Sequence, residues 1–269
     1  MIGVFDSGYG GLTILKQFRD KLPEYDFLYL GDNARAPYGT RSFDIVYDFT
    51  RQAVEHLFEQ GCPLVILACN TASAKALRSI QQNVLPDRWP DRRVLGVIRP
   101  TVEDVGDITK SRHVGLLATP GTVNSHSYRM EIAKIHPDIT ITEQACPMWV
   151  YLVECGEAQN DGADWFVRKY LDRILEQDPE IDTLVLGCTH YPILLPKIRK
   201  YAPQDINIVP QGDLVAASLK DYLHRHPEID CRCTKNGTVR YSTTESTEKF
   251  NPLASLFIGE PVSAERIVL

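Results

Sequence analysis

The sequence predicts an α/β protein of two similar domains, each built on a mostly parallel sheet flanked by helices. Short apolar runs alternate with amphipathic segments along almost the whole chain, as expected when strands are joined by crossover helices. One strand-and-cysteine segment occurs twice, once in each half of the chain. The 269 residues are enough for two ordinary domains, each with a buried core.

In the first part of the chain we expect four strands and three helices. The strands are residues 2–5, 27–30, 64–68 and 94–98, and the helices are 12–22, 42–60 and a segment after Cys69. Leucine and phenylalanine recur at helical spacing in 12–22, and Gly61 stops the helix at 42–60. The run 64–68 is apolar without alternation, which is typical of a strand buried on both faces. Arg99-Pro100 is predicted to cross into the second domain.

The same alternation continues from residue 114 nearly to the end of the chain. The predicted strands are 114–118, 139–144 and 184–186, with helices from the turn 119–122 through 132, around 165–175 and after Pro192. A helix at 214–223, an edge strand at 238–242, a helix near 253–257 and a strand near 267 complete the pattern. We therefore assign residues 1–98 plus 211–269 to the first domain and residues 99–210 to the second.

Composition excludes several classes of protein. The chain has 29 Lys and Arg against 35 Asp and Glu, a net charge of −6, and no basic stripe, so we expect no nucleic-acid partner. No apolar run approaches the roughly 20 residues that span a bilayer, and the first residues already form a strand, so we expect neither a membrane segment nor a leader. Seven thinly spread cysteines favour a reducing, cytoplasmic setting.

The repeated segment brings two cysteines into equivalent positions. The run Leu64-Val65-Ile66-Leu67-Ala68-Cys69-Asn70-Thr71 resembles Thr183-Leu184-Val185-Leu186-Gly187-Cys188-Thr189-His190. Each copy is a buried strand, a small residue, a cysteine, and then polar groups that open a helix. Because ligand groups collect at the carboxyl ends of parallel strands, two such half-sites indicate similar domains that face each other.

Two facing cysteines predict proton transfer at both sides of one carbon. A cysteine at a helix N-terminus has its thiolate favoured by the exposed N–H groups, so Cys69 and Cys188 are a candidate base and acid. Inversion of a carbon next to a carboxylate needs that pair, together with donors for the developing charge. Candidate donors are Ser7, Asn70, Thr71 and Thr189, and the candidate proton relays are Asp6 and His190, with Glu154 orienting His190 or holding an ammonium group.

Four blocks of sequence resemble the glutamate racemases of the aspartate/glutamate racemase superfamily. They are the runs 4–12 (VFDSGYGGL), 31–39 (GDNARAPYG), 68–73 (ACNTAS) and 187–192 (GCTHYP), and Phe257-Ile258-Gly259 near the end fits as well. The resemblance implies two α/β domains with the active site between them, no pyridoxal phosphate and no metal. It also implies glutamate as the substrate, supply of D-glutamate for peptidoglycan in a bacterial cytosol, and compatibility with a homodimer.

The resemblance carries over residue by residue. Cys69 and Cys188 become the two acid/base residues, Cys69 for the D-enantiomer and Cys188 for the L-enantiomer, assisted by Asp6, His190 and Glu154. The implied substrate contacts are Asp6, Ser7, Pro37, Tyr38, Gly39, Asn70, Thr71, Thr119, Thr122, Thr189 and His190. The chain departs from the pattern around Thr119, where Ala118 and Gly121 stand in place of an expected glycine and alanine.

Other interpretations stay open at this point. The turn Gly8-Tyr9-Gly10-Gly11 imitates a dinucleotide fingerprint, although Thr13 stands where its third glycine is needed, so a nicotinamide oxidoreductase is one alternative. A non-catalytic glutamate-binding module is another, and aspartate racemase uses the same chemistry. Asp32 is either a site residue or a turn residue.

The remaining cysteines and histidines are interpreted as structural. A lone cysteine is usually a small core residue, and Cys231-Arg232-Cys233 lacks the spacing of a zinc site, so no metal is expected. The residues interpreted in this way are the core or loop thiols Cys62, Cys146 and Cys155 and the surface histidines His113, His136, His224 and His226.

Overall fold

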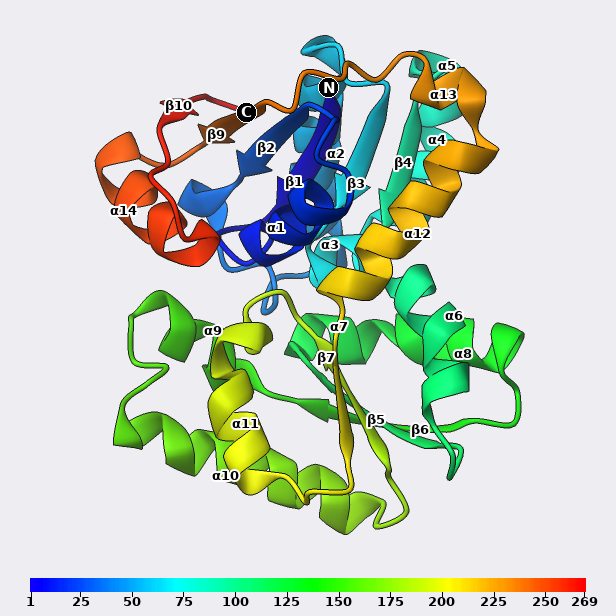
Figure 1. Cartoon of the computed structure of the whole chain (residues 1–269), viewed down its shortest axis with the longest axis vertical. Helices are drawn as coiled ribbons and strands as arrows, with labels where there is room; N and C mark the ends of the chain where they lie inside the picture. The colour runs from blue at the N-terminus through cyan, green and yellow to red at the C-terminus, as the bar shows by residue number, and fades with distance from the viewer.

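The computed structural model describes residues 1–269 and consists of two lobes, each built on a parallel sheet (Figure 1). The first sheet has the strand order β10-β9-β2-β1-β3-β4 and the second has the order β6-β5-β7-β8. All neighbouring strands are parallel. No helix combines the length and the apolar character that a bilayer crossing requires. The predicted α/β fold class is confirmed.

The first lobe holds both ends of the chain (Figure 1). Its strands are β1 (Ile2–Asp6), β2 (Phe27–Gly31), β3 (Leu64–Leu67), β4 (Arg93–Gly96), β9 (Val239–Thr243) and β10 (Ala264–Arg266). One face packs against α1 (Leu12–Lys21), α12 (Gly212–Arg225) and α14 (Thr247–Ile258). The other packs against α2 (Phe43–Glu59), α4 (Leu77–Asn83) and α5 (Leu85–Arg88). Three shorter elements belong to this lobe, namely η1 (Asn33–Arg35), α3 (Asn70–Lys75) and α13 (Pro227–Asp230).

The second lobe repeats this arrangement with four strands. They are β5 (His113–Ala118), β6 (Thr140–Ala145), β7 (Thr183–Gly187) and β8 (Asn207–Pro210). One face packs against α6 (Ile98–Ile108) and α8 (Ser127–Ile135). The other packs against α9 (Pro147–Glu154), α10 (Asp161–Gln177) and α11 (Leu195–Tyr201). Two short helices, α7 (Pro120–Ser125) and η2 (Tyr191–Leu194), follow β5 and β7.

Burial on both faces explains the apolar runs in the sequence. Successive side chains of a strand point to opposite faces, so Val4 of β1 lies in the core under α1 while Phe5 lies in the core under α2. Every residue of β1, β2, β3 and β7 is buried. A central strand of this kind needs apolar side chains at each position, which removes the alternation of a half-exposed strand.

Both sheets have a point where the strand order reverses. In the first sheet β2 lies on one side of β1 and β3 on the other, and in the second β6 and β7 flank β5 in the same way. Loops that leave the carboxyl ends of strands at such a point diverge and leave a crevice, which is where ligands bind in open α/β sheets. Cys69 follows β3 and Cys188 follows β7, so the two cysteines occupy equivalent switch points.

Several predicted elements were wrong in detail. Arg99-Pro100, predicted as the crossing point between the domains, is helical, because both residues lie in the first turn of α6, where proline is tolerated. Strand β4 ends at Gly96, earlier than predicted. Strand β9 is not at the edge, because the three-residue β10 covers it. Helix α9 and strand β8 were not predicted at all.

Candidate active site

One cavity lies between the carboxyl ends of the two sheets. It contains about 530 Å³ of empty space, including its opening to solvent. The first lobe lines it with Ser7, residues 37–40 and residues 69–71. The second lobe lines it with Thr119, Glu154 and residues 188–190, among others. Twelve of the fourteen predicted site residues therefore line this cavity. The other two, Asp6 and Thr122, are not among its lining residues.

The thiol of Cys69 is held by the start of α3. Cys69 is the N-cap residue, and its Sγ accepts a hydrogen bond from the N–H of Ala72 at 3.5 Å and lies 3.4 Å from Ser7 Oγ. Burial, together with the charge of Asp6, nevertheless raises the pKa of Cys69 to about 12. The N–H of Ala72 at the helix N-terminus does act to lower this pKa, as predicted, but the predicted net shift toward the thiolate is wrong, because desolvation outweighs two weak hydrogen bonds. In the free protein Cys69 is a thiol, ready to donate a proton.

Asp6 lies close enough to this thiol to influence it by its charge. Its carboxylate is fully buried, accepts the N–H of Gly8 at 2.9 Å, and is 3.4 Å from the donating hydroxyl of Thr189 in the other lobe. Burial raises the pKa of Asp6, although the nearby His190 and the backbone donors oppose that shift. Asp6 therefore connects the Cys69 side of the site to the second lobe without lining the cavity.

Cys188 has a different neighbour. Its Sγ lies 3.8 Å from Nδ1 of His190, and Nε2 of the same ring lies 2.9 Å from Oε1 of Glu154, the last residue of α9. Burial by itself would lower the pKa of His190, but the hydrogen bonds to Cys188 and Glu154 outweigh it and raise that pKa to about 10. His190 is thus an imidazolium at neutral pH, and a cation beside the sulfur stabilises negative charge there.

Three threonine hydroxyls meet where the helices α3 and α7 begin. The Oγ1 of Thr71 is 2.9 Å from that of Thr119, which in turn is 3.1 Å from that of Thr122. Thr119 is the N-cap of α7 and accepts the N–H of Thr122. Two hydroxyls from opposite lobes at the cavity wall are suitable donors to a carboxylate, and Thr122 supports them from behind.

The loop at residues 37–40 closes the first-lobe side of the cavity, and Asp32 anchors it. The hydroxyl of buried Tyr38 donates to the carboxylate of Asp32, which also accepts from Arg35 Nε at 2.7 Å and Thr244 Oγ1 at 2.8 Å. Asp32, which the sequence left open, holds this loop rather than facing the cavity.

The same loop touches the second lobe through Gly121. The carbonyl of Gly39 accepts the N–H of Gly121 at 2.7 Å, and a Cβ on Gly121 would lie 2.9 Å from that oxygen. The departure from the expected alanine therefore permits a close backbone contact across the mouth of the site.

The glycine-rich turn after β1 also serves contact between lobes. A Cβ on Gly10 would overlap the side chains of Thr189 and His190. Thr13 strengthens this contact, because its hydroxyl bonds the carbonyl of Thr189 at 3.0 Å. The space over the turn is thus filled by the second lobe, which disfavours a dinucleotide pyrophosphate at that position.

Thiols outside the two half-sites are free and arranged without a metal geometry. Cys231 is exposed and Cys233 is buried, and each lies within reach of a backbone carbonyl of α13. Cys146, predicted as a core or loop thiol, is buried and lines the cavity. The residues of α9 near it, including Val150 and Tyr151, were missed because α9 itself was not predicted.

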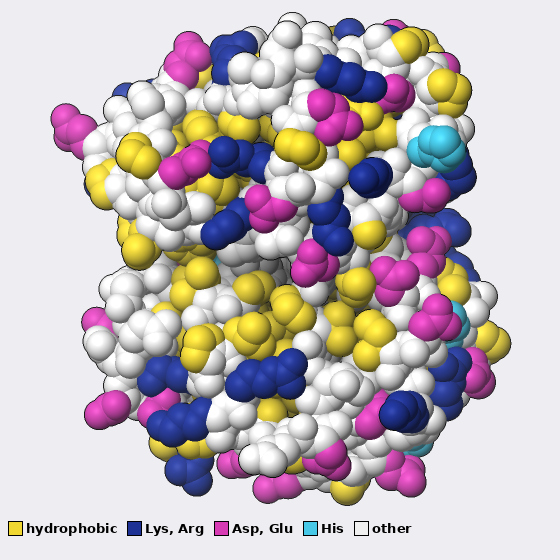
Figure 2. Space-filling view, viewed as in Figure 1, with side chains coloured by type: hydrophobic (Ala, Val, Ile, Leu, Met, Phe, Trp, Pro, Cys, Tyr) yellow, Lys and Arg dark blue, Asp and Glu magenta, His cyan; other side chains and the backbone are white.

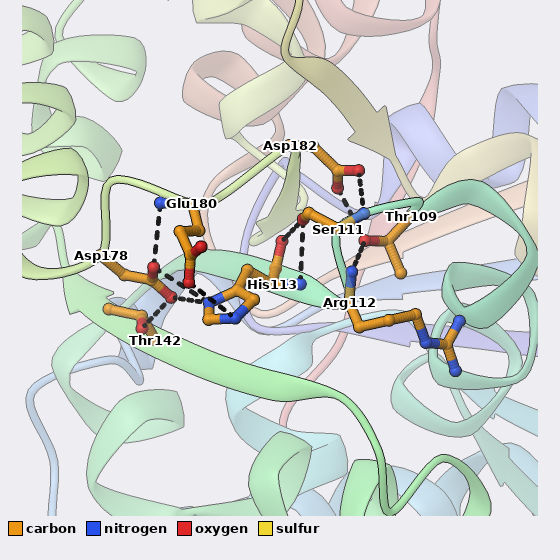
Figure 3. Close-up of polar contacts among 8 residues, drawn as sticks. All are labelled: Thr109, Ser111, Arg112, His113, Thr142, Asp178, Glu180 and Asp182. Atoms are coloured by element: carbon orange, nitrogen blue, oxygen red, sulfur yellow. Dashed lines mark hydrogen bonds and ion pairs between the residues drawn. The ribbon is translucent and has the colours of Figure 1, made fainter.

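One cluster elsewhere has the composition of a metal site. His113 lies with its two ring nitrogens 2.9 Å from Asp178 and 3.2 Å from Glu180, at the start of β5 and the opposite end of the sheet from the cavity (Figure 3). His113 is partly buried, not a free surface residue as predicted. Since both ring nitrogens already face carboxylates, the cluster is best described as an ion-pair network.

The face of the molecule drawn in Figure 2 is mixed in charge. Figure 2 shows positive and negative side chains interspersed over this face, with hydrophobic side chains gathered along the furrow between the lobes. This face carries no continuous basic stripe of the kind that binds nucleic acid.

Comparisons with known proteins agree with this architecture. A family model described as Asp/Glu/Hydantoin racemase matches residues 13–219. A glutamate racemase from Roseobacter denitrificans is 43% identical over 267 residues, which cover 96% of each chain. The solved structure of a glutamate racemase isoform from Bacillus anthracis has a TM-score of 0.91 and 32% identity, covering 100% of this chain and 97% of its own.

A second solved structure carries a ligand. The glutamate racemase from Francisella tularensis, in complex with D-glutamate, has a TM-score of 0.87 and 32% identity, covering 99% of this chain and 97% of its own. Likeness of this extent, in sequence and in structure, leaves the interpretation as a nicotinamide enzyme without support. The chain belongs to the glutamate racemases of the Asp/Glu/hydantoin racemase family, which are isomerases.

Proposed function

We propose that the protein interconverts L- and D-glutamate by a two-base mechanism in which Cys69 and Cys188 act on opposite faces of the α-carbon. The observation that carries the proposal is that thiols from the switch points of two different sheets line one cavity. A base and an acid on opposite sides of one carbon are what inversion of that carbon requires. The names of the relatives, and the D-glutamate in one of them, support glutamate as the substrate.

In the direction from L- to D-glutamate, Cys188 acts as the base. The imidazolium of His190 stabilises its thiolate, which takes the α-proton and becomes a thiol. Cys69, a thiol in the free protein, donates its proton to the other face of the carbon and becomes a thiolate. One proton leaves and one arrives, so the substrate returns to its original charge. The reverse direction exchanges the two roles.

Hydrogen-bond donors lower the barrier by stabilising charge on the α-carboxylate as the proton departs. Thr71 and Thr119 at one end of the cavity, with Ser7 and Thr189, supply hydroxyls from both lobes. Glu154 orients His190 through the bond at Nε2 and balances its charge. Asp6, buried next to Cys69, accepts and returns the proton of that thiol between turnovers.

We also propose the wider context of this activity. The domains are residues 1–98 plus 211–269 and residues 99–210, a division supported by the strands of the first sheet coming only from the first set. The protein acts in the bacterial cytoplasm, without pyridoxal phosphate or metal, and supplies D-glutamate for peptidoglycan. A homodimer is compatible with this activity.

The test is a racemisation assay on the purified, dialysed protein with chelator present. Circular dichroism at a wavelength where the amino acid absorbs follows the loss of ellipticity, first with L-glutamate and then, separately, with L-aspartate. We expect L-glutamate to racemise and L-aspartate to remain unchanged. Racemisation of aspartate alone would reassign the substrate, whereas binding of glutamate without racemisation would make the protein a binding module. Activity that requires added nicotinamide dinucleotide would overturn the proposal.

A further inference from the structure

A closed ring of hydrogen bonds lies next to Cys69 and joins the two lobes. Asn70 Nδ2 donates to Gln211 Oε1 at 2.6 Å, Gln211 Nε2 donates to the hydroxyl of Tyr128 at 2.6 Å, and that hydroxyl donates to Asn70 Oδ1 at 2.7 Å. All three side chains are at most 2% exposed. Because each group donates to the next, the ring fixes the orientation of both amides.

The ring sits where the chain crosses between the lobes. Gln211 is the residue between β8 of the second sheet and α12, which packs on the first sheet. Its Nε2 also donates to Thr101 Oγ1 at 2.7 Å, and Thr101 in turn donates to the carbonyl of Val97, the residue between β4 and α6. One buried amide thus touches both crossings.

Asn70 is the member of the ring that connects it to Cys69 and to the cavity. Asn70 follows Cys69 directly and is the first residue of α3, whose N-cap is Cys69. The ring occupies one N–H of its Nδ2 and one lone pair of its Oδ1, so one N–H remains for the cavity that Asn70 lines. Loss of the ring would free this side chain to rotate and would leave buried polar groups unpaired, which loosens the start of α3.

We propose that Gln211, with Tyr128, is a positioning residue for the racemase reaction, fixing Asn70 and the Cys69 thiol relative to the crossings between the lobes. This inference rests on the proposed function for its link to catalysis. Neither residue lines the cavity, and neither is in contact with Cys188 through a hydrogen bond. Burial and, to a lesser degree, the charge of nearby Cys188 raise the pKa of Tyr128, so this phenol lies close to Cys188 as well. The effect of changing Gln211 should therefore be confined to the Cys69 side.

The test uses Gln211→Met and Tyr128→Phe, which keep the shape of each side chain and remove its part of the ring. The matched control is Tyr25→Phe, whose partly buried hydroxyl donates to Asp230 away from the cavity. We expect each ring variant to lower kcat/KM about tenfold, and the double variant to lose little more than either single one, because one ring is broken in each case. The control should retain its activity.

A second readout separates positioning from general destabilisation. Alkylation by iodoacetamide, followed by peptide mapping, gives the labelling rates of Cys69 and Cys188 in the same molecule. We expect Cys69 to label several-fold faster in the ring variants, with Cys188 unchanged in Gln211→Met, which is the variant that decides the test. Equal acceleration of both thiols, or labelling and kcat/KM as in the unaltered protein, would overturn the inference. If the unaltered protein does not racemise glutamate, the proposed function fails, while the labelling ratio still tests the ring.

Discussion

The Cys69 and Cys188 half-sites share a backbone frame but differ in their charges. Each cysteine follows a central strand at the switch point of its sheet. Cys69 has a buried carboxyl group, Asp6, beside it, which helps to keep it protonated, whereas Cys188 has an imidazolium, His190. Repetition of the fold thus placed the two thiols in equivalent positions, but a carboxyl group lies near Cys69 and a cation lies beside Cys188. In the mechanism proposed above, this difference makes Cys188 the base that takes the α-proton of L-glutamate.

The largest effect should come from removing either thiol. Cys69→Ser and Cys188→Ser should each fold normally and lose racemisation by at least about a thousandfold, because a serine hydroxyl is a much weaker acid than a thiol. Circular dichroism of the glutamate solution measures the rate, and Cys155→Ser, at an exposed cysteine, is the control. Each variant should still eliminate from one enantiomer of a suitable analogue. Full activity in either variant would defeat the two-base assignment.

The next effect tests the asymmetry itself. His190→Asn removes the imidazolium and should lower kcat about a hundredfold, with His224→Asn as an exposed control. Because the pKa of His190 is raised to about 10, the imidazolium is present at neutral pH and is lost as the pH rises through that value. The unaltered protein should therefore lose activity on that alkaline limb, which a pH series of kcat measures. An identical limb in His190→Asn would show that another group titrates.

A smaller effect is expected from the loop opposite the thiols. Asp32→Asn weakens the anchor of Tyr38 and Arg35, so the loop at 37–40 should hold substrate less well, raising KM about tenfold with little change in kcat. Initial rates over a range of glutamate concentrations separate the two constants. Asp91→Asn breaks an exposed carboxylate–arginine pair with Arg232 and serves as the control. A fall in kcat with unchanged KM would place Asp32 in the chemistry instead.

The smallest effect concerns a region with no part in the reaction. Pairing with Asp178 raises the pKa of His113, so this contribution to stability is present below about pH 6.5 and is lost as the pH rises through the raised value (Figure 3). The pKa of Asp178 is lowered: burial opposes this, but the bond to His113 outweighs it, and its contribution is lost as the pH falls. His113→Ala should therefore lower Tm by a few degrees near pH 5.5 and by less near pH 9, with unchanged kcat. An equal fall in Tm at both pH values would show that the ion pair between His113 and Asp178 does not stabilise the fold.

The parts of the fold that could be predicted from the sequence were those with local signals. Central strands appear as apolar runs, and the repeated strand-and-cysteine segment indicates that both thiols follow equivalent strands. Helix α9 escaped prediction because Pro147–Glu154 is mostly apolar all round and shows no helical period. A final strand near residue 267 was predicted, but its pairing with β9 was not, because the sequence does not indicate which strand the three residues of β10 would join.

The identity of the site residues could be predicted, but their protonation and their contacts with one another could not. The protonation of Cys69 depends on burial and on Asp6, which lies 63 positions earlier, so a local argument from the helix N-terminus gave the wrong direction. The ring of Asn70, Tyr128 and Gln211 joins three distant segments, and the three residues do not share a sequence motif. The backbone contact of Gly121 with Gly39 joins residues 82 positions apart, so no local signal indicates it. Each of these features is a property of the tertiary contacts.

The measurement that tests the central claim most directly is isotope incorporation in heavy water. At early conversion of L-glutamate, proton NMR and mass spectrometry should show D-glutamate with deuterium at the α-carbon in every molecule, while the remaining L-glutamate keeps its proton. This result follows when one thiol removes the proton and another, already exchanged with solvent, delivers its own. D-glutamate that retains the original α-proton would contradict the account, because a single base would then serve both faces.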